Sequence, residues 1–419
     1  MSELAPVTRS VLLLHMTGNA NVRQAALALH QAQMLAGFYT TIAWRTGSAL
    51  DHILPLRLRS ELARRSFPGI TPELIHTHPW REVVRLIAIR RGWHRLYRHE
   101  TDPFSTDTIC ANLDRAAARA LARGRAPDAV YALDNCALQT FAVARDRGVH
   151  CIYELPIGHY RAYQQIVKEE RELSPEWAST LTGIDDSPKM LAQKDQELSS
   201  ADTIFVASSF TARTLETYPG PLTKAIHIVP YGAPPVGPQR TPTRRDEPLR
   251  VLFVGSLGQR KGFGYLIEAV DQLQVPYTLT LLGRPIGRPG VMEKALCRHH
   301  WIESAPHAEV LKIMREHDVL VFPSLFEGFG LVILEAMAQG TVVIATTHTA
   351  AADILEDGQD GFIVPIRSAE AIAQRLTQLA EDRDLLASMS ESARQKAALW
   401  SWERFREQWI TAVWASIAT

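Results

Sequence analysis

Residues 319–340 have the sequence VLVFPSLFEGFGLVILEAMAQG, an apolar run followed by a turn and then by a segment with helical spacing. The composition of the run is typical of a buried parallel strand, and Gly328 and Gly330 free the turn to approach a ligand. Glu327 lies in the turn, and Glu335 follows about two helical turns later on the same face. This spacing predicts two carboxylates along one crevice, where one could hold sugar hydroxyls and the other a ribose. Two incidental glutamates are the alternative.

A similar unit lies upstream, where residues 254–262 have the sequence VGSLGQRKG and precede a helix predicted over residues 263–273. The glycines expose backbone N–H groups at the positive end of that helix, and Arg260 and Lys261 add two cations. These features suit a diphosphate. Glycine-rich turns also follow strands in many α/β proteins for purely structural reasons, so this turn alone identifies no ligand.

Short apolar runs alternate with amphipathic stretches along the whole chain, which predicts an α/β fold with doubly wound parallel sheets. The alternation occurs twice. In the first half we predict strands at residues 10–15, 39–44, 129–133, 151–155, 203–207 and 226–229. In the second half we predict strands at residues 250–254, 277–282, 319–322, 341–345 and 361–364.

The two sets of strands indicate two domains, as the length of 419 residues also does. Residues 230–248 are rich in proline and poor in apolar residues, the composition of a linker. We therefore predict a first domain over residues 1–235 and a second over residues 248–399. The segment 400–419 is a predicted helix with too many large apolar groups to leave in water, so it should pack back across a domain surface; these are Trp400, Trp402, Phe405, Trp409 and Trp414.

The composition excludes several classes of protein. Lys and Arg together number 45, as do Asp and Glu, so no net field favours nucleic acid. The four cysteines are scattered, which indicates reduced and mostly packed thiols. They are Cys110, Cys136, Cys151 and Cys297. No cluster has metal-ligand spacing, and we interpret Asp185-Asp186 as a solvated loop. The first nine residues lack the pattern of a secretion signal, and no apolar run is long enough to span a bilayer, so we expect a cytoplasmic protein.

Residues 57–99 are unusual because they hold ten arginines and three acidic residues. Apolar residues recur there at helical intervals with arginines between them, which predicts an amphipathic basic helix. One interpretation is contact with an anionic membrane surface or with an anionic, lipid-linked acceptor. The other is a solvated arginine face above an ordinary packed stripe, and periodicity does not separate the two. The apolar positions are Trp80, Val83, Val84, Ile87, Trp93, Leu96 and Tyr97.

Together these motifs resemble family 4 of the glycosyltransferases, retaining enzymes of the GT-B architecture, in which two Rossmann-like domains face a central cleft. The resemblance covers the Gly-to-Lys-Gly turn at residues 255–262, the two glutamates of residues 327–335, and the stretch DGQDGFIVP at residues 357–365 with Ser401-Trp402. The first half is similar more loosely, through VASSFTARTL at residues 206–215 and IVPYGA at residues 228–233. The family commonly has asparagine where this chain has Tyr231.

The resemblance implies a nucleotide-diphosphate sugar, with UDP and GDP both open, held mainly by the second domain, and an acceptor held mainly by the first. Lys261 and Arg260 would neutralise the diphosphate. Glu335 would bind the ribose, and the sugar hydroxyls and phosphate would be held by Glu327 and by the backbone of Gly328, Phe329, Gly330 and Leu331. Glu327, Lys261 and Arg260 are thus the expected catalytic residues, and the chemistry requires no metal or other cofactor.

The first domain departs from the family pattern. Residues 15–21, HMTGNAN, follow the first strand, and the corresponding loop of the family approaches the donor phosphate. This chain keeps one glycine there, Gly18, where many members have two. Many members also place a histidine near the reacting sugar after the strand at residues 151–155, whereas this chain has Glu154 and then His159. Either residue is a candidate for the acceptor or active site.

The function expected from the resemblance is transfer of a hexose to an acceptor hydroxyl with retained anomeric configuration, in glycan, polysaccharide or glycolipid biosynthesis. The acceptor could be a glycan, a lipid-linked sugar or a small molecule. In the family an arginine often follows the first glycine of the diphosphate turn, where this chain has Ser256. The departures at Ser256, Tyr231 and Glu154 leave open a noncatalytic partner that binds a sugar nucleotide. An epimerase or phosphorylase of the same shape is a third hypothesis, which explains the paired glutamates less well.

Overall fold

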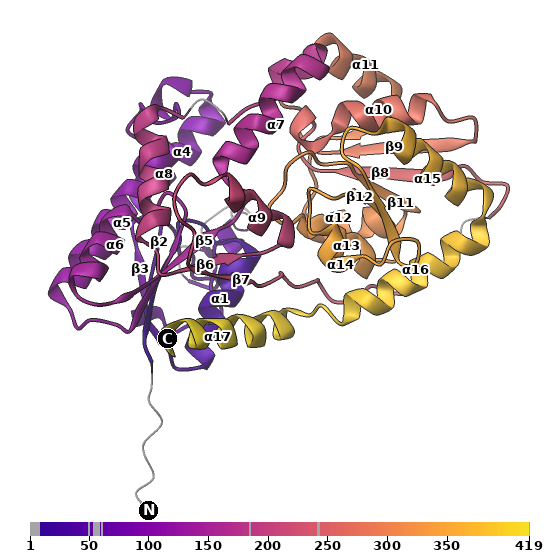
Figure 1. Ribbon diagram of the computed structural model, residues 1–419. Helices are drawn as coiled ribbons and strands as arrows, with labels where there is room; N and C mark the ends of the chain where they lie inside the picture. The colour runs from indigo at the N-terminus through magenta and orange to yellow at the C-terminus, as the bar shows by residue number, and fades with distance from the viewer. Residues whose placement is uncertain are drawn as a thin grey trace, which may run out of the picture.

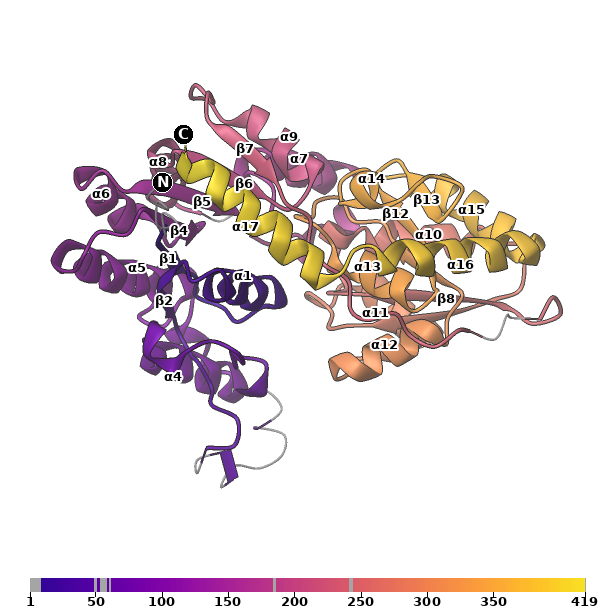
Figure 2. The same ribbon diagram turned by 90° about the horizontal axis from the view of Figure 1, so that it is seen from below.

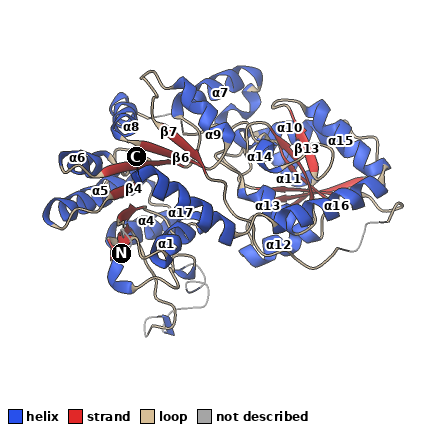
Figure 3. Cartoon of the chain, turned by 60° about the horizontal axis from the view of Figure 1, so that its bottom comes forward, coloured by secondary structure: helices blue, strands red, loops and turns tan. Residues whose placement is uncertain are grey.

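The computed structural model describes residues 9–48, 51–52, 59, 62–183, 186–240 and 244–418. The chain forms two parallel sheets, each with helices on both faces (Figure 1), and Figure 3 shows the same layering by secondary structure. Each sheet lies between two clusters of buried apolar side chains. The predicted α/β fold with two doubly wound units is therefore confirmed.

The first sheet has seven strands in the order β3-β2-β1-β4-β5-β6-β7. The strands are β1 (Val11–Leu14), β2 (Leu35–Thr40), β3 (Ile75–Thr77), β4 (Ala129–Leu133), β5 (His150–Leu155), β6 (Thr203–Val206) and β7 (Ala225–Ile228). Its helices are α1 (Ala20–Gln31), α4 (Pro79–Arg91), α5 (Thr106–Arg123), α6 (Leu138–Asp146), α7 (Tyr160–Leu173), α8 (Pro188–Ser200) and α9 (Ser209–Thr214). We call this unit the N-terminal domain.

The second sheet has six strands in the order β10-β9-β8-β11-β12-β13. They are β8 (Leu249–Val254), β9 (Tyr277–Leu282), β10 (His300–Ile302), β11 (Val319–Phe322), β12 (Val342–Thr346) and β13 (Gly361–Val364). Its helices are α10 (Phe263–Asp271), α11 (Gly290–Arg298), α12 (His307–Arg315), α13 (Leu331–Ala338), α14 (Ala351–Ile354), α15 (Ala369–Glu381) and α16 (Arg383–Ala398). We call this unit the C-terminal domain.

One strand prediction is wrong, and two strands were missed. The strand predicted at residues 39–44 is wrong, because β2 spans Leu35–Thr40 and its pairing with β1 begins at Leu35 opposite Val11. The edge strands β3 and β10 were missed. Each has three residues that are half-buried or exposed, so neither shows the continuous apolar run of a buried strand.

The last helix, α17 (Trp402–Ala418), returns from the C-terminal domain and packs along α1 of the N-terminal domain, as Figure 2 shows. Its buried stripe is Phe405, Trp409 and Val413. This confirms the expected packing across the domains. The expectation is wrong for Trp414, which is 39% exposed and carries the Arg9 guanidinium 5.3 Å from its ring centre.

The four cysteines are free thiols, and Cys297 is exposed while the other three are buried. Among the described helices, none combines the length and the apolar content needed to cross a bilayer.

The packing of α17 generates a stability prediction. Trp409 is 2% exposed and lies against Tyr131 and Phe205, with ring centres 5.0 Å and 6.3 Å away. We expect Trp409→Ala to lower the free energy of unfolding by about 3–5 kcal/mol, because it leaves a cavity in the core. Urea denaturation followed by circular dichroism measures the change. The control Trp414→Ala, on the exposed face of the same helix, should cost less than about 1 kcal/mol. Equal losses in both variants would contradict this packing.

Candidate functional site

Two turns of the C-terminal domain meet at the carboxyl ends of β8 and β11, the edge of a parallel sheet where ligands usually bind. Gly262 makes this contact possible. It has φ of 68°, and a Cβ atom there would lie 1.9 Å from the carbonyl oxygen of Pro323. The backbone N–H of Leu325 donates to the Arg260 carbonyl at 2.9 Å, which holds the turn at residues 255–262 against the turn at residues 323–330.

This contact brings the predicted cations to the predicted carboxylate. The Lys261 ammonium is in direct contact with the Glu327 carboxylate, and Arg260 Nη1 lies 3.6 Å from the same oxygen. Arg260 also donates to the carbonyl of Phe326 at 2.9 Å. Burial and the Arg260 charge lower the pKa of Lys261 well below its usual value, and the touching carboxylate opposes that change. Two basic side chains therefore face one carboxylate in a half-buried position.

Glu335 has a different partner. It lies in α13, and its Oε1 is 3.7 Å from Nδ1 of His307 at the start of α12. Burial raises the pKa of Glu335, and the nearby His307 acts in the opposite direction. Sequence reasoning missed His307, because this residue belongs to no motif and to no periodic pattern.

The start of α13 offers backbone donors beside these charges. Gly330 has φ of 85° and forms the N-cap, and the N–H groups of Gly330 and Leu331 donate to no other described residue. Phe329 is buried, so it contributes to this site through its backbone only. Free N–H groups at the positive end of a helix attract an anion.

Gly328 carries the contact between the two domains. Its carbonyl accepts hydrogen bonds from Ser208 Oγ at 2.5 Å and Thr211 Oγ1 at 2.9 Å. A Cβ atom on Gly328 would lie 1.9 Å from the carbonyl oxygen of Pro156. The turn after β11 thus touches the turn after β5, and the carboxyl ends of both sheets meet.

A second contact between the domains surrounds the buried carboxylate of Glu170 in α7. It accepts hydrogen bonds from Gln259 at 2.7 Å, Tyr265 at 2.9 Å and Arg367 at 2.8 Å, all in the C-terminal domain. Thr180 adds a bond by accepting from the backbone N–H of Gln259 at 2.9 Å. The turn that carries Arg260 and Lys261 is therefore fixed to the N-terminal domain as well.

Gly18 lies in the turn after β1, where it is half-buried against residues 64–67. A Cβ atom there would lie 3.3 Å from Arg65 Cα and 3.4 Å from the Phe67 ring. The glycine thus permits a close approach between two segments of the N-terminal domain.

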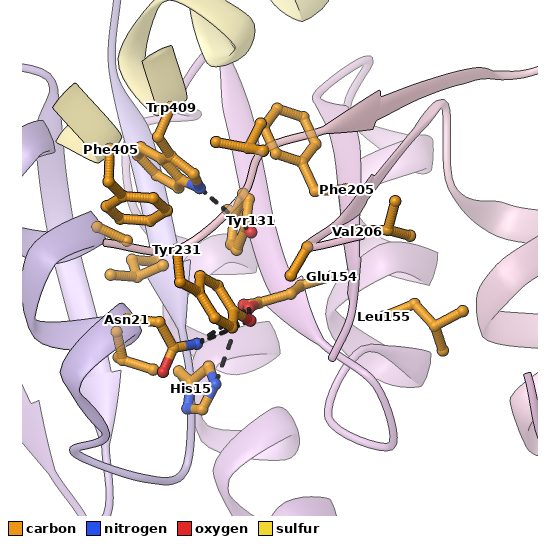
Figure 4. A pocket seen from close by; sticks show the side chains of 15 residues that line it. His15, Asn21, Tyr131, Glu154, Leu155, Phe205, Val206, Tyr231, Phe405 and Trp409 are labelled. Carbon is orange, nitrogen blue, oxygen red and sulfur yellow. Dashed lines mark hydrogen bonds and ion pairs between the residues drawn. The ribbon is translucent and has the colours of Figure 1, made fainter. Parts of the chain in front are cut away.

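Glu154, at the end of β5, belongs to an enclosed polar cluster beneath that turn (Figure 4). Its Oε1 accepts from Asn21 Nδ2 at 3.4 Å and from the Tyr231 hydroxyl at 3.5 Å, and its Oε2 lies 3.9 Å from His15 Nε2. The cavity beside the cluster has about 20 Å³, space for about one water molecule. It has no room for a sugar.

Burial controls the charges of this cluster. It raises the pKa of Glu154 to about 7 and lowers the pKa of His15 to about 3. The backbone N–H of Thr17 donates to His15 Nδ1 at 3.1 Å, so the neutral ring carries its proton on Nε2, facing Glu154.

His159 lines a larger cavity, of about 330 Å³, between the two domains. Its Nδ1 lies 2.9 Å from the hydroxyl of Thr217, and that hydroxyl donates to the carbonyl of Thr214 at 2.7 Å. The Thr217 oxygen therefore accepts, and His159 carries its proton on Nδ1. Burial lowers the pKa of His159 to about 4, so the ring is neutral near pH 7. Its Nε2 is buried and has no hydrogen-bond partner among the described residues, which leaves a bare acceptor.

The walls of this cavity are aromatic, with charged groups from both domains. Tyr160, Tyr163 and Phe326 supply rings, and Arg260 brings the charge of the C-terminal domain. Phe326 and Arg260 are the chain neighbours of Glu327 and Lys261, so the cavity lies next to the charged group. Lys261, Glu327 and Glu335 are not among its lining residues.

Asp186 is not the solvated loop residue that we expected, and Asp185 lies outside the described residues. The Asp186 carboxylate pairs with Lys194 Nζ at 2.6 Å and with His99 Nε2 at 2.7 Å. Within the described residues, His99, Glu100 and Asp186 are close enough to hold a metal ion. Because Asp186 is already paired with a lysine and His99 Nδ1 is 2.9 Å from Asp107, these contacts satisfy the cluster internally.

The second half of the chain is similar to known glycosyltransferases. Residues 239–396 match the family model described as "Glycosyl transferases group 1". The chain is 34% identical over 173 residues to the D-inositol 3-phosphate glycosyltransferase of Corynebacterium urealyticum, and 31% identical over 187 residues to a putative colanic acid biosynthesis glycosyltransferase of Salmonella typhimurium. These alignments cover 38% and 41% of this chain, and they span less than half of each relative, 41% and 45%.

Solved structures match almost the whole chain. Sucrose-phosphate synthase from Thermosynechococcus elongatus superposes with a TM-score of 0.65 at 18% identity, covering 98% of this chain and 99% of its own. Anabaena HepE in complex with UDP-glucose gives 0.61 at 14% identity, covering 97% and 99%. The fold is the GT-B architecture of two facing Rossmann-like domains.

The Glu154 cluster generates a prediction about pH. The pKa of Glu154 rises from 4.5 in the unfolded chain to about 7 in the fold, so the folded state binds this proton more tightly. The stabilisation from that proton is complete below pH 4.5 and is lost as the pH rises through 7. We expect Glu154→Gln, which stays neutral, to become more stable relative to the wild type between about pH 5 and pH 8, by up to about 3 kcal/mol.

Urea denaturation at several pH values measures this difference. Glu216→Gln removes an exposed carboxylate from the same domain, and its difference from the wild type should stay flat. A flat difference for Glu154→Gln as well would show that Glu154 is ionised in the fold throughout.

Proposed function

We propose that the protein is a glycosyltransferase that moves a hexose from a nucleotide-diphosphate sugar to an acceptor hydroxyl with retention of anomeric configuration. The observation that carries this proposal is the group of Arg260, Lys261 and Glu327 beside the start of α13, at the meeting of the two domains. All of these residues lie within the segment that matches the glycosyltransferase model. The names of the relatives favour a role in glycan, polysaccharide or glycolipid biosynthesis.

The charges suit a diphosphate leaving group. Lys261 and Arg260 share one carboxylate, so Glu327 does not fully neutralise them. The remaining positive charge attracts an incoming diphosphate. The N–H groups of Gly330 and Leu331 supply further donors. As the bond to the sugar breaks, negative charge develops on the diphosphate, and these fixed groups stabilise it there. We therefore propose that the reaction needs no metal ion, and that a chelator leaves its rate unchanged.

The two glutamates take different parts of the donor. In this proposal Glu327, released from Lys261 by the diphosphate, accepts hydrogen bonds from the sugar hydroxyls, and Glu335 with His307 binds the ribose. Glu335 lies in α13 beyond the anion-binding start of that helix, which suits the nucleoside end of the molecule. The donor nucleotide is UDP or GDP.

We place the acceptor in the 330 Å³ cavity. The bare Nε2 of His159 can accept a hydrogen bond from an acceptor hydroxyl, and the rings of Tyr160, Tyr163 and Phe326 offer apolar walls to a sugar. The acceptor hydroxyl attacks the sugar on the same face from which the diphosphate departs. The leaving phosphate takes the proton of that hydroxyl. A strong protein base is then not required, and Glu154 stays a buried structural group. A glycan, a lipid-linked sugar or a small polyol fits this chemistry.

The donor site yields the first activity prediction. We expect Lys261→Ala and Glu327→Ala each to lower kcat by about a hundredfold or more, because each removes a contact to the transition state. Release of UDP or GDP from a panel of nucleotide sugars, first without acceptor, measures turnover. The controls Lys312→Ala and Glu316→Ala remove one lysine and one glutamate from an exposed pair in the same domain and should keep normal rates.

Near-normal turnover in both Lys261→Ala and Glu327→Ala would remove the site assignment. Donor binding without any release of nucleotide diphosphate would instead favour the noncatalytic sugar-nucleotide-binding partner. Thermal stabilisation by each nucleotide sugar identifies the donor, because a tight ligand raises the unfolding midpoint.

The acceptor cavity yields a separate prediction. We expect His159→Ala to raise the KM for the acceptor by about tenfold, because one buried hydrogen bond to the hydroxyl is lost. Hydrolysis of the donor without acceptor should stay at the wild-type rate. An unchanged acceptor KM, or a parallel loss of donor hydrolysis, would contradict the placement of the acceptor.

A further inference from the structure

Helix α4 buries a glutamate and exposes several large apolar side chains, which is unusual for a surface helix. Its buried face holds Glu82, which is 2% exposed and pairs with Arg65 at 2.9 Å and Arg85 at 2.7 Å. Its outer face holds Trp80, Val83 and Ile87, at helical spacing, which are 58%, 42% and 46% exposed. We call these three residues the α4 face. Of the seven apolar positions predicted from the sequence, four are exposed and three are half-buried, so the stripe is only partly packed.

Cations surround the α4 face. The Arg81 guanidinium lies 4.4 Å from the ring centre of Trp80. Beyond the end of α4, Trp93 is 50% exposed with the Arg91 guanidinium 5.9 Å from its ring centre. Apolar side chains rimmed by arginine are typical of a helix that lies in the interface of an anionic bilayer. The chain as a whole has no net charge, whereas residues 57–99 hold ten arginines and three acidic residues.

A basic cavity of about 170 Å³ opens beside the α4 face, between α4 and α5. Arg81, Arg115, Arg119 and His78 line it, and none of the described lining residues is acidic; the others are Thr41, Trp80, Ile109, Asn112, Leu113 and Ala116. Among the described residues, neither Arg115 nor Arg119 has an ion-pair partner. Three guanidinium groups without a facing carboxylate suit a phosphate group.

Trp80 belongs to both features, since it lies on the α4 face and lines the cavity. A ligand that fills both must carry an anionic group directly beside an apolar one. We propose that α4 and the arginine cavity together form a membrane-docking site, in which the cavity binds the phosphate of an anionic phospholipid and the α4 face enters the boundary between headgroups and acyl chains. This inference does not rest on the proposed transfer reaction.

The position of α4 suits this role. The helix follows the edge strand β3 and lies on the part of the N-terminal domain that is far from the C-terminal domain in both views (Figures 1 and 2). A chain docked through α4 therefore keeps its C-terminal domain clear of the membrane, open to a water-soluble nucleotide sugar.

Sedimentation of the full chain with vesicles tests the proposal. We expect binding to vesicles of phosphatidylcholine with phosphatidylglycerol, and little binding to phosphatidylcholine alone. The double variant Arg115→Gln, Arg119→Gln should weaken binding roughly fivefold for each arginine removed. The double variant Trp80→Ser, Ile87→Ser should weaken binding at least as much, because it removes the apolar face. Since the substituted side chains are exposed, and Arg115 and Arg119 pair with no acidic group in the described part of the chain, unfolding midpoints should change little.

Matched controls come from other exposed positions. Arg244→Gln, Arg245→Gln removes two exposed arginines, and Leu173→Ser, Leu399→Ser removes two apolar side chains that are 62% and 65% exposed. Both should bind vesicles like the wild type. Equal binding by control and α4 variants, or equal binding to neutral and anionic vesicles, would overturn the proposal. So would thermal stabilisation by inorganic phosphate without vesicle binding, or a dimer that Trp80→Ser, Ile87→Ser dissociates.

Discussion

Two close approaches of backbone to backbone, at Gly262 and Gly328, hold the candidate site together. At each of them a Cβ atom would lie 1.9 Å from a carbonyl oxygen, which no side chain permits. The first approach joins the turn after β8 to the turn after β11 and so brings Lys261 to Glu327. The second joins that pair of turns to the N-terminal domain at Pro156. The site exists because glycine stands at both positions, and the charged side chains only occupy a geometry that the backbone has already set.

Buried carboxylates complete this arrangement in two ways. Glu170 is fully covered, and three donors from the C-terminal domain satisfy its oxygens, so the interface between the domains depends on a complete set of hydrogen bonds. Glu154 has weaker partners, at 3.4 Å and 3.5 Å, and its environment favours the protonated form. The two buried acids thus differ in their partners: Glu170 faces an arginine, whereas Glu154 faces neutral amide and phenol groups, and burial raises the pKa of Glu154.

The sequence predicted the regular parts of the fold well, because a buried parallel strand is a continuous apolar run. It predicted β9, β11 and β13 with their observed limits. It missed β3 and β10 because each has only three residues, half-buried or exposed, and so shows no continuous apolar run. Within the site, the glycine-rich turns of the sequence predicted Lys261, Arg260 and Glu327 as site residues. His307 and the hydrogen bonds that leave His159 Nε2 bare depend on contacts between segments distant in the chain, and no local pattern reports them.

Helix α4 shows the limit of periodicity most clearly. Its sequence contains an apolar stripe and a charged stripe, and a helical wheel shows both without saying which one faces the protein. The deciding residue is Arg65, which lies outside the helix and pairs with Glu82 from below. Glu82 has its partner on the inner side of the helix, whereas Trp80, Val83 and Ile87 are exposed in the part of the chain that the structure describes. One tertiary ion pair therefore converts an ordinary amphipathic pattern into an exposed apolar face beside a cavity lined with arginines.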